Sequence, residues 1–353
     1  MKNRLAVICA GILAVLLLVF LVVFNHQKPR VLILHGFSEE GPWEQAFDAG
    51  FRRGLEHNRQ PLSVRWRYMM YSQYLSDRQW VAASQRSREI IDNWQPDVLV
   101  TVGEEAQDYV GRYYAGQASP RVVYIINENP ALFDYPGAAN VTGVHEVLPL
   151  GQIGDILQFM GRSPLRIRAI GVEDPTGRAE AQQVQAHDWG PHQFLGVDLA
   201  TDAVDWRSRV LALTDQVDIL LVLSAGGLPE SPDISEDINP DQLSGWTAKH
   251  AKPLSIGIRE SFVIGGGALA VVPSPGGLGH QAAQQTLLAL QAIQSAQALP
   301  PPKNSQDYLI ALRPDELAAR GLKLPEIYLQ AARGTHTLYP KYGEDLGSSG
   351  LSH

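Results

Sequence analysis

Cysteine is nearly missing from this sequence, which has a single one, Cys9, among 353 residues. A disulfide framework and a cysteine-based zinc site both need more than one cysteine, so both are excluded. Basic residues are outnumbered, with 29 Lys and Arg against 37 Asp and Glu, which disfavours nucleic-acid binding through clustered positive charge. The composition is not that of a disordered chain, because 45% of the residues are apolar and can form a core.

Long apolar runs are also missing, with one exception at the amino terminus. Residues 5–24 form a run of 20 residues without a charge, which as a helix would span about 30 Å, the thickness of a bilayer core. No pair of small residues that would mark a cleavage site follows the run. We therefore interpret residues 1–29 as an uncleaved membrane anchor, with a cleaved signal peptide as the alternative. Two basic residues flank the run on each side, so charge does not fix its orientation.

After residue 29, strand-like and helix-like patterns alternate. The apolar runs that predict strands are 31–34, 63–67, 98–102 and 122–126 in the first half, and 169–172, 194–198, 219–223 and 254–258 in the second. Between them, apolar residues recur at helical spacing, as Trp43, Phe47, Phe51 and Leu55 do. Two sets of four strands with crossover helices predict an α/β protein with two Rossmann-like lobes, each built on a parallel sheet.

The loops that follow the predicted strands are the places to look for a ligand site. In open parallel sheets, ligands bind at the carboxyl ends of the strands. If the two edges face each other, these loops line one cleft. The candidate ligand-binding residues in these loops are Ser38, Glu39, Glu40, Gly103, Glu104, Glu105, Asn127, Glu128, Asp174, Thr176, Ser224, Arg259 and Glu260.

Several short stretches, taken in their order along the chain, resemble a known family. They are 96–100 (PDVLV), 140–144 (NVTGV), 170–175 (IGVEDP), 267–270 (GALA), 278–281 (LGHQ), and 309–312 (LIAL) through 321–325 (GLKLP). The pattern resembles the ABC transporter substrate-binding proteins with the type I periplasmic-binding fold. The resemblance is to the branch that includes binders of tryptophan and other aromatic amino acids.

The resemblance implies a hinged protein whose two lobes are joined by a multi-strand hinge and close on a small molecule. The chain would cross between lobes near residues 147, 274 and 304. Lobe 1 would then comprise 30–147 and 275–303, and lobe 2 would comprise 148–274 and 304–333. We expect the remainder, 334–353, to be a disordered tail. The resemblance also favours a soluble region outside the cytoplasmic membrane.

The chain departs from the family in three of its loops. Glu104 and Glu105 stand where members carry a TPAAQ-like loop, Glu128 stands where they carry a TDP-like triplet, and Ser224 stands where they carry a PTDN-like loop. The predicted cleft loops therefore hold many carboxylates: Glu39, Glu40, Glu104, Glu105, Glu128, Glu173 and Asp174. Only Arg178 and Arg259 oppose them. Carboxylates without counter-charges raise one another's pKa, so we predict a ligand with an amine or many hydroxyls. The alternative is that several of these acids are solvated surface charges.

Other candidate chemistries are weaker. Tyr68, Tyr71 and Tyr74 could stack on a ligand, but core and edge packing is the favoured interpretation. Residues 31–37 resemble the strand and oxyanion loop of α/β-hydrolases, but the G-x-S-x-G elbow that such enzymes need is missing. The glycine-rich stretches near 265 and 276 lack the spacing of nucleotide-binding loops. The ten histidines contain no H-x-x-x-H pair, so we expect no metal and no cofactor.

The sequence is therefore interpreted as a binding protein and not as an enzyme. We predict a single-pass protein of the inner (cytoplasmic) membrane, with its soluble region in the periplasm or otherwise outside the cytoplasm. It would close on a small molecule and deliver it to the permease of an ABC-type uptake system. The alternative is a ligand-binding sensory partner of a membrane histidine kinase or diguanylate cyclase. An α/β-hydrolase-like enzyme is a third reading.

Overall fold

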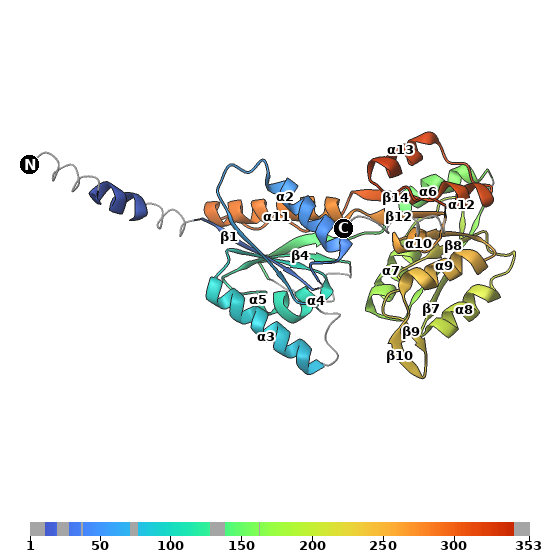
Figure 1. Ribbon diagram of the computed structural model, residues 1–353, viewed down its shortest axis with the longest axis horizontal. Coiled ribbons are helices and arrows are strands. Elements are labelled where there is room, and N and C mark those ends of the chain that lie inside the picture. The colour runs from blue at the N-terminus through green and yellow to red at the C-terminus, as the bar shows by residue number, and fades with distance from the viewer. Residues whose placement is uncertain are drawn as a thin grey trace, which may run out of the picture.

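The computed structural model describes residues 11–19, 28–36, 38–70, 77–127, 138–161 and 163–341. These residues form two lobes that lie side by side, each with a sheet between layers of helices (Figure 1). Residues 11–19 are helical, and their apolar side chains are exposed. Within the described ranges, no helix combines the length and the apolar character that a membrane span requires. The predicted anchor over 5–24 lies largely outside these ranges and stays a prediction.

The first sheet has six parallel strands in the order β13-β5-β4-β3-β1-β2. Its central strands β1, β3 and β4 are mostly apolar and buried because helices cover both faces. Side chains on one face pack on α2 and α11, and those on the other face pack on α3 and the short helices that follow β3. The bounds are β1 Arg30–His35, β2 Ser63–Tyr68, β3 Val98–Val102, β4 Arg121–Ile126, β5 Val141–His145, β13 Lys303–Asn304, α2 Pro42–Leu55, α3 Asp77–Trp94, α4 Glu104–Ala106, a π-helix Gln107–Gly111, α5 Arg112–Tyr114 and α11 Pro275–Ser295.

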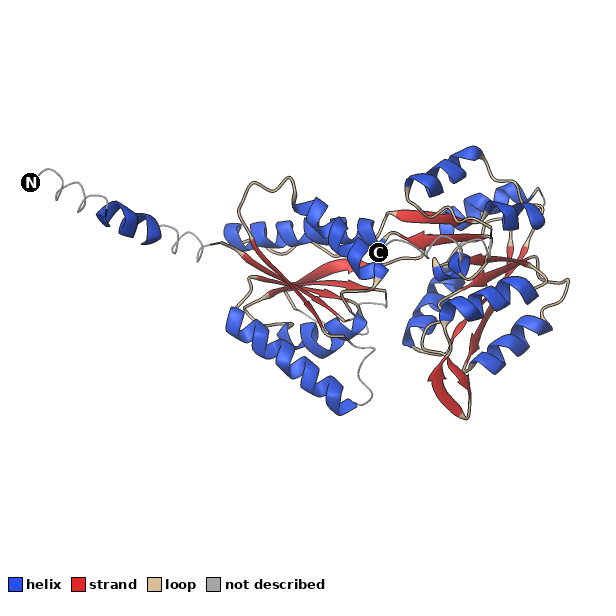
Figure 2. Cartoon of the chain, in the orientation of Figure 1, coloured by secondary structure: helices blue, strands red, loops and turns tan. Residues whose placement is uncertain are grey.

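The second sheet also has six strands, in the order β14-β12-β11-β8-β6-β7, and only β14 runs antiparallel to its neighbour. Apolar side chains on its two faces form two separate cores, with helices on both sides (Figure 2). The bounds are β6 Arg166–Val172, β7 Gln193–Ala200, β8 Ile219–Val222, β11 Leu254–Gly257, β12 Leu269–Pro273, β14 Tyr308–Leu312, α6 Leu150–Leu157, a 3-10 turn Gln158–Met160, α7 Pro175–Ala186, α8 Ala203–Ala212, α9 Pro240–His250, α10 Ser261–Ile264, α12 Pro314–Ala319, α13 Glu326–Gly334, and a hairpin of β9 Pro229–Ser231 and β10 Ile234–Asp237.

The prediction of an α/β protein with two parallel-sheet lobes is confirmed. All eight predicted strands are present, with ends that differ by a few residues. The sequence did not predict β5, β12, β13, β14 or the β9–β10 hairpin.

Three segments of the chain connect the two sheets, after β5, after β12 and between β13 and β14. They hydrogen-bond to one another. The Val147 amide donates to Ser305 Oγ at 2.9 Å, and the Ser274 amide donates to the carbonyl of Asp307 at 3.0 Å. The connection therefore consists of three crossing segments that are hydrogen-bonded to one another. It restricts the relative movement of the lobes more than a single linker would.

The expectation of a disordered tail from residue 334 is wrong for its first part. Thr337 is buried, and its hydroxyl donates to the carbonyl of Ile310 at 2.7 Å. Leu338 bridges to Leu312 beside the second sheet, and the Tyr339 hydroxyl donates to Glu260 Oε1 at 2.6 Å. These contacts hold the chain against β14 through Pro340, because the edge strand supplies free backbone groups. Residues 342–353 lie outside the described ranges.

Helices α2 and α11 approach each other so closely that only glycine fits at their contact. A Cβ on Gly279 would lie 2.0 Å from the backbone oxygen of Phe47, and a Cβ on Gly50 would lie 2.0 Å from that of Gly276. We expect Gly279→Ala to lower the free energy of unfolding by about 2 kcal/mol, because the two backbones must separate. Urea unfolding measures the change.

The matched control for this substitution is Gly151→Ala. Gly151 lies in helix α6 with open space around its Cβ position, so alanine there should stabilise the protein by about 0.5–1 kcal/mol. If both alanines had the same sign of effect, the close helix contact would not be what requires glycine at 279.

Candidate functional site

A cavity of about 280 Å³ lies between the two lobes. The ends of β1, β3 and β4 and the start of α2 contribute to its wall from the first lobe, and Thr176 and Arg259 contribute from the second. It therefore lies where the carboxyl ends of both parallel sheets meet, as expected for this kind of fold. The lining residues are His35, Trp43, Glu44, Val102, Gly103, Glu104, Glu105, Ile125, Ile126, Asn127, Glu146, Thr176 and Arg259.

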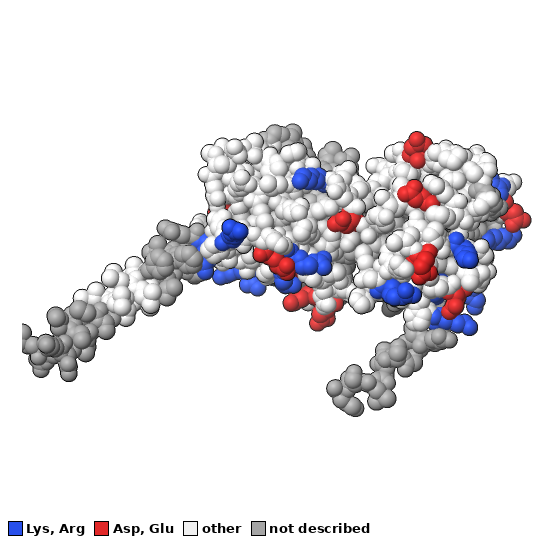
Figure 3. Space-filling view, turned by 90° about the horizontal axis from the view of Figure 1, so that it is seen from above, with Lys and Arg blue, Asp and Glu red and all other residues white. Residues whose placement is uncertain are grey.

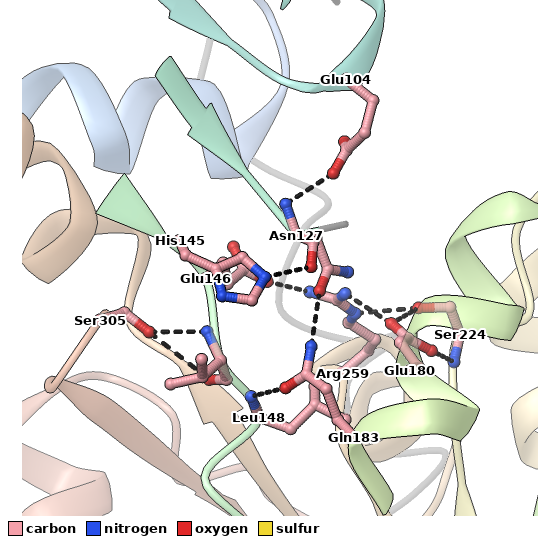
Figure 4. A network of polar contacts seen from close by, with 11 residues as sticks. Glu104, Asn127, His145, Glu146, Leu148, Glu180, Gln183, Ser224, Arg259 and Ser305 are labelled. Atoms are coloured by element: carbon pink, nitrogen blue, oxygen red, sulfur yellow. Dashed lines mark hydrogen bonds and ion pairs between the residues drawn. The ribbon is translucent and has the colours of Figure 1, made fainter. Parts of the chain in front are cut away.

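Arg259 is the centre of an ion-pair network at this cavity (Figure 4). Its NH1 donates to Glu146 Oε1 at 2.9 Å, and its NH2 donates to Glu180 Oε1 at 2.6 Å. Its Nε donates to Ser224 Oγ at 3.0 Å. The side chain of Glu180 is fully buried and that of Glu146 nearly so. Arg259 thus joins the segment after β5 to helix α7 and to the end of β8.

The charges in this network depend on one another. Burial raises the pKa of the Glu146 carboxyl, and the Arg259 guanidinium opposes that rise. Burial alone would lower the pKa of Arg259, but the carboxylates of Glu180 and Glu146 hold it above its usual value. Arg259 therefore stays charged, and the carboxylates of Glu146 and Glu180 largely neutralise its charge.

A second set of contacts joins the lobes through Asn127, at the end of β4. Its backbone amide donates to Glu104 Oε1 at 2.6 Å, and its backbone carbonyl oxygen lies 2.9 Å from His145 Nε2. Across the cleft, Gln183 Nε2 of helix α7 donates to Asn127 Oδ1 at 3.4 Å. The same Gln183 accepts from the Leu148 amide in the crossing segment at 2.9 Å. The contact between lobes is thus polar and long, which is compatible with opening and closing.

On the first-lobe side, His35 forms a buried pair with Asp48. His35 Nε2 lies 2.9 Å from Asp48 Oδ1, and both side chains are almost completely buried. Asp48 also accepts from Trp66 Nε1 at 3.0 Å and from the Tyr68 hydroxyl at 2.6 Å. Burial would raise the pKa of Asp48, but the hydrogen bonds from His35 and Tyr68 outweigh it, so the pKa lies below its usual value.

This pair makes the free energy of unfolding depend on pH. Because the folded pKa of Asp48 is lower than its unfolded value near 3.9, its contribution is fully present above that value. The contribution is lost as the pH falls through the folded pKa. Each unit of depression corresponds to about 1.4 kcal/mol. We expect Asp48→Asn to remove this part of the acid dependence, measured by urea unfolding between pH 7 and pH 3. A slope that is equal in both proteins would contradict it.

The sequence-predicted site residues fall into two groups. Gly103, Glu104, Glu105, Asn127, Thr176 and Arg259 line the cavity, and Ser224 contacts Arg259 behind it. The others lie elsewhere. Ser38, Glu39 and Glu40 form a loop before α2, where Ser38 Oγ accepts from the Glu40 amide. Asp174 caps helix α7 through the Gly177 amide, and Glu260 is bound by Tyr339. Glu128 lies outside the described ranges.

Fewer of the predicted acidic residues lie at the cavity than their loop positions suggested. Acidic residues still outnumber basic ones among the described residues of its wall. Glu173 pairs with Arg178 at 2.6 Å, with both side chains exposed. Among the described residues of the cavity wall, four are acids (Glu44, Glu104, Glu105 and Glu146) and one is an arginine, Arg259. On the surface shown in Figure 3, by contrast, acidic and basic residues are intermixed on the second lobe. Burial also raises the pKa of Glu44, and the nearby Asp48 carboxylate contributes to the rise.

Sequence reasoning missed His35, Trp43, Glu44, Glu146 and Glu180. His35 is the last residue of β1, so the rule that pointed to the loops could have included it. Glu146 directly follows β5, a strand that was not predicted. Glu180 lies inside helix α7, and no loop rule would find it.

Searches of known proteins found similarity in structure alone. No protein-family model matches the chain, and no curated protein matches it. Among solved structures, a ligand-free, open substrate-binding protein with adhesive properties from Clostridium difficile is similar, with a TM-score of 0.64 at 12% identity, over 88% of this chain and 98% of that one. An ABC domain in complex with L-Trp from Streptococcus pneumonia gives 0.59 at 16%, over 86% and 98%. An arabinose-binding protein from Geobacillus stearothermophilus gives 0.54 at 11%, over 84% and 100%.

At these identities the similarity defines the fold. The chain has the two-lobed fold of the type I periplasmic binding proteins, as its sequence motifs suggested. Solved structures with this fold include sugar-binding and amino-acid-binding proteins.

Proposed function

We propose that this protein is a solute-binding protein that closes on a small molecule between its lobes and delivers it to an ABC-type uptake system. The observation that carries the proposal is the cavity at the facing carboxyl edges of the two sheets, with walls from both lobes. A ligand that contacts both walls binds the closed form better than the open one, so it shifts the equilibrium toward closure. The lobes would be 30–147 with 275–303, and 148–274 with 304–333.

The cavity charge supports a ligand rich in hydrogen-bond donors, either an amine or a polyhydroxylated compound. The described wall holds four carboxylates and one guanidinium, and each nitrogen of that guanidinium already donates to a side chain of the protein. An ammonium group would relieve the repulsion among the acids, and Trp43 offers an aromatic face for a cation or a sugar ring. A purely anionic ligand would find its counter-charge already occupied.

The apolar run at 5–24 supports a tether to the inner membrane, with the two lobes outside the cytoplasm. A tethered binding protein stays at high local concentration near a membrane partner. A permease is the partner in the uptake reading. The tether equally favours the alternative partner, a histidine kinase or diguanylate cyclase that reads the closed form.

A thermal-shift screen over amines, amino acids, sugars and nucleosides tests the function. A ligand at 100 times its dissociation constant should stabilise the folded state by about 2.7 kcal/mol. Mass spectrometry of the ligand after denaturation of the complex should return it unchanged, whereas an enzyme would convert it. Tighter binding of anionic than of cationic or neutral compounds, measured by calorimetry, would contradict the proposed ligand class.

A further inference from the structure

Among the described residues at the cavity, Nδ1 of the His35 ring is a buried nitrogen without a hydrogen-bond partner. His35 is 1% exposed and lines the cavity, and its Nδ1 contacts no donor or acceptor in the described part of the chain. A buried polar group without a partner is costly, and in native structures such a group has a reason. Its other ring nitrogen, Nε2, is already bound to Asp48.

The carboxylate of Asp48 determines what Nδ1 can do. An ionised carboxylate only accepts, so the proton of a neutral His35 ring must sit on Nε2. Nδ1 then carries a lone pair and is an acceptor. Asp48 is itself held by Trp66 and Tyr68, so it cannot turn to offer a different arrangement.

The ring of His35 is also fixed in place. Tyr68 stacks on one face, with ring centres 4.9 Å apart, and Phe47 meets it edge-on at 5.5 Å. A side chain that is already held in position loses little entropy when a ligand binds it. With the Nε2 edge occupied by Asp48 and Tyr68 stacked on the ring, Nδ1 is the ring nitrogen that no described group of the protein binds.

We infer that His35 is a ligand-contacting residue whose Nδ1 accepts a hydrogen bond from an ammonium or hydroxyl group of the solute, and that Asp48 is the positioning residue that fixes its tautomer. The inference rests on the proposed solute-binding function and names the protein atom that accepts a hydrogen bond from the solute. It predicts discrimination against solutes that present only carboxylate oxygens, because these offer acceptors to an acceptor.

The experiment is nitrogen-15 NMR of the full chain with labelled histidine, with methylammonium, glycerol and acetate as probes. In the free protein at pH 7.5, His35 should show the tautomer protonated at Nε2. Methylammonium or glycerol should move the Nδ1 resonance upfield, and acetate should not. A free protein with the proton on Nδ1, or a shift with acetate alone, would overturn the inference. So would the absence of a shift with any probe.

Variants separate the role of His35 from the function as a whole. The solute found by the thermal-shift screen should bind Asp48→Asn and His35→Gln at least tenfold more weakly than the wild type. His57→Gln, at an exposed position, is the matched control and should bind as the wild type does. If the wild type binds a solute and both variants bind it equally well, the inference fails while the proposed function stands. If the wild type binds no solute, the proposed function fails, and the NMR result on the free protein still decides the tautomer.

Discussion

Arg259→Met is expected to destabilise the protein by about 3 kcal/mol. The substitution keeps the bulk of the side chain but leaves Glu146 and Glu180 buried without their counter-charge. Removal of one partner from a buried ion pair typically costs about 3–5 kcal/mol, because the remaining charge is uncompensated. The lower end is appropriate here because the Arg259 side chain is 28% exposed. Urea unfolding at pH 7.5 measures the difference.

The deficit of Arg259→Met should shrink as the solution is acidified. Burial already raises the pKa of Glu146 above its usual value, and Arg259 is what opposes that rise. Without Arg259 the folded pKa rises further above the unfolded one. The folded state then binds more protons than the unfolded state, so the variant gains stability relative to the wild type as the pH falls.

The matched control is Arg178→Met. Arg178 pairs with Glu173 at 2.6 Å, the same distance that separates Arg259 from Glu180. Both members of the control pair are solvated, because 50% of the Arg178 side chain and 39% of the Glu173 side chain are exposed. An exposed pair of this kind contributes at most about 1 kcal/mol. If the two variants lost the same stability, burial would not be the reason for the cost at Arg259, and the network would be a surface ion pair like the other.

The fold was predictable because most strands of both sheets are buried on two faces. Such strands appear in the sequence as continuous apolar runs, and β3 and β8 are clear cases. Of the strands that were missed, β12 is also a buried apolar run that the same rule should have found, whereas β5 and β14 differ in other ways. β5 contains Thr142 and Gly143, and Gly143 is required there because a Cβ would lie 2.3 Å from the Tyr124 carbonyl oxygen. β14 is an edge strand that begins with an exposed Tyr308.

The site was predictable only where it follows from strand ends. Gly103, Asn127 and Arg259 lie in the loops that the rule for parallel sheets identified. Glu180 and Asp48 lie inside helices. The hydrogen-bond partners of Glu180 are 44 and 79 residues away in the sequence, and His35 and Tyr68, which bind Asp48, are 13 and 20 residues away. No local pattern therefore reveals either residue. Asp48 did leave a trace, because it is a carboxylate next to the buried stripe of Phe47 and Phe51, and a buried acid in such a place needs donors.

Trp206→Ala is expected to have the largest effect of all, a loss of about 3–5 kcal/mol in the second lobe. Trp206 is a fully buried residue of helix α8 at the centre of one core of the second sheet. Its Nε1 donates to Thr247 Oγ1 on α9 at 2.9 Å. Alanine would leave a cavity where the indole packs, and the cost rises with the part of that cavity that cannot collapse.

Two further variants show that the effect comes from burial. Trp206→Phe keeps most of the ring and should lose only part of the stability. Trp246→Ala removes a half-buried indole from the neighbouring helix, where Arg207 and His250 contact it near the surface, and should cost about 1 kcal/mol. A loss as large as that of Trp206→Ala would show that exposed surface, and not the core, supplies the stability.

The same variant tests whether the two lobes are separate cooperative units. They have distinct cores, and in the described part of the chain they are joined by the three crossings and the contacts at the cleft, so local stability can differ between them. In Trp206→Ala, backbone amides of β8 should exchange with deuterium much faster than in the wild type, whereas those of β3 should keep their protection. Equal acceleration in both strands would mean that the lobes unfold together. In that case the hinge would carry enough contact energy to hold them as one body, and closure on a solute would have to be a small movement.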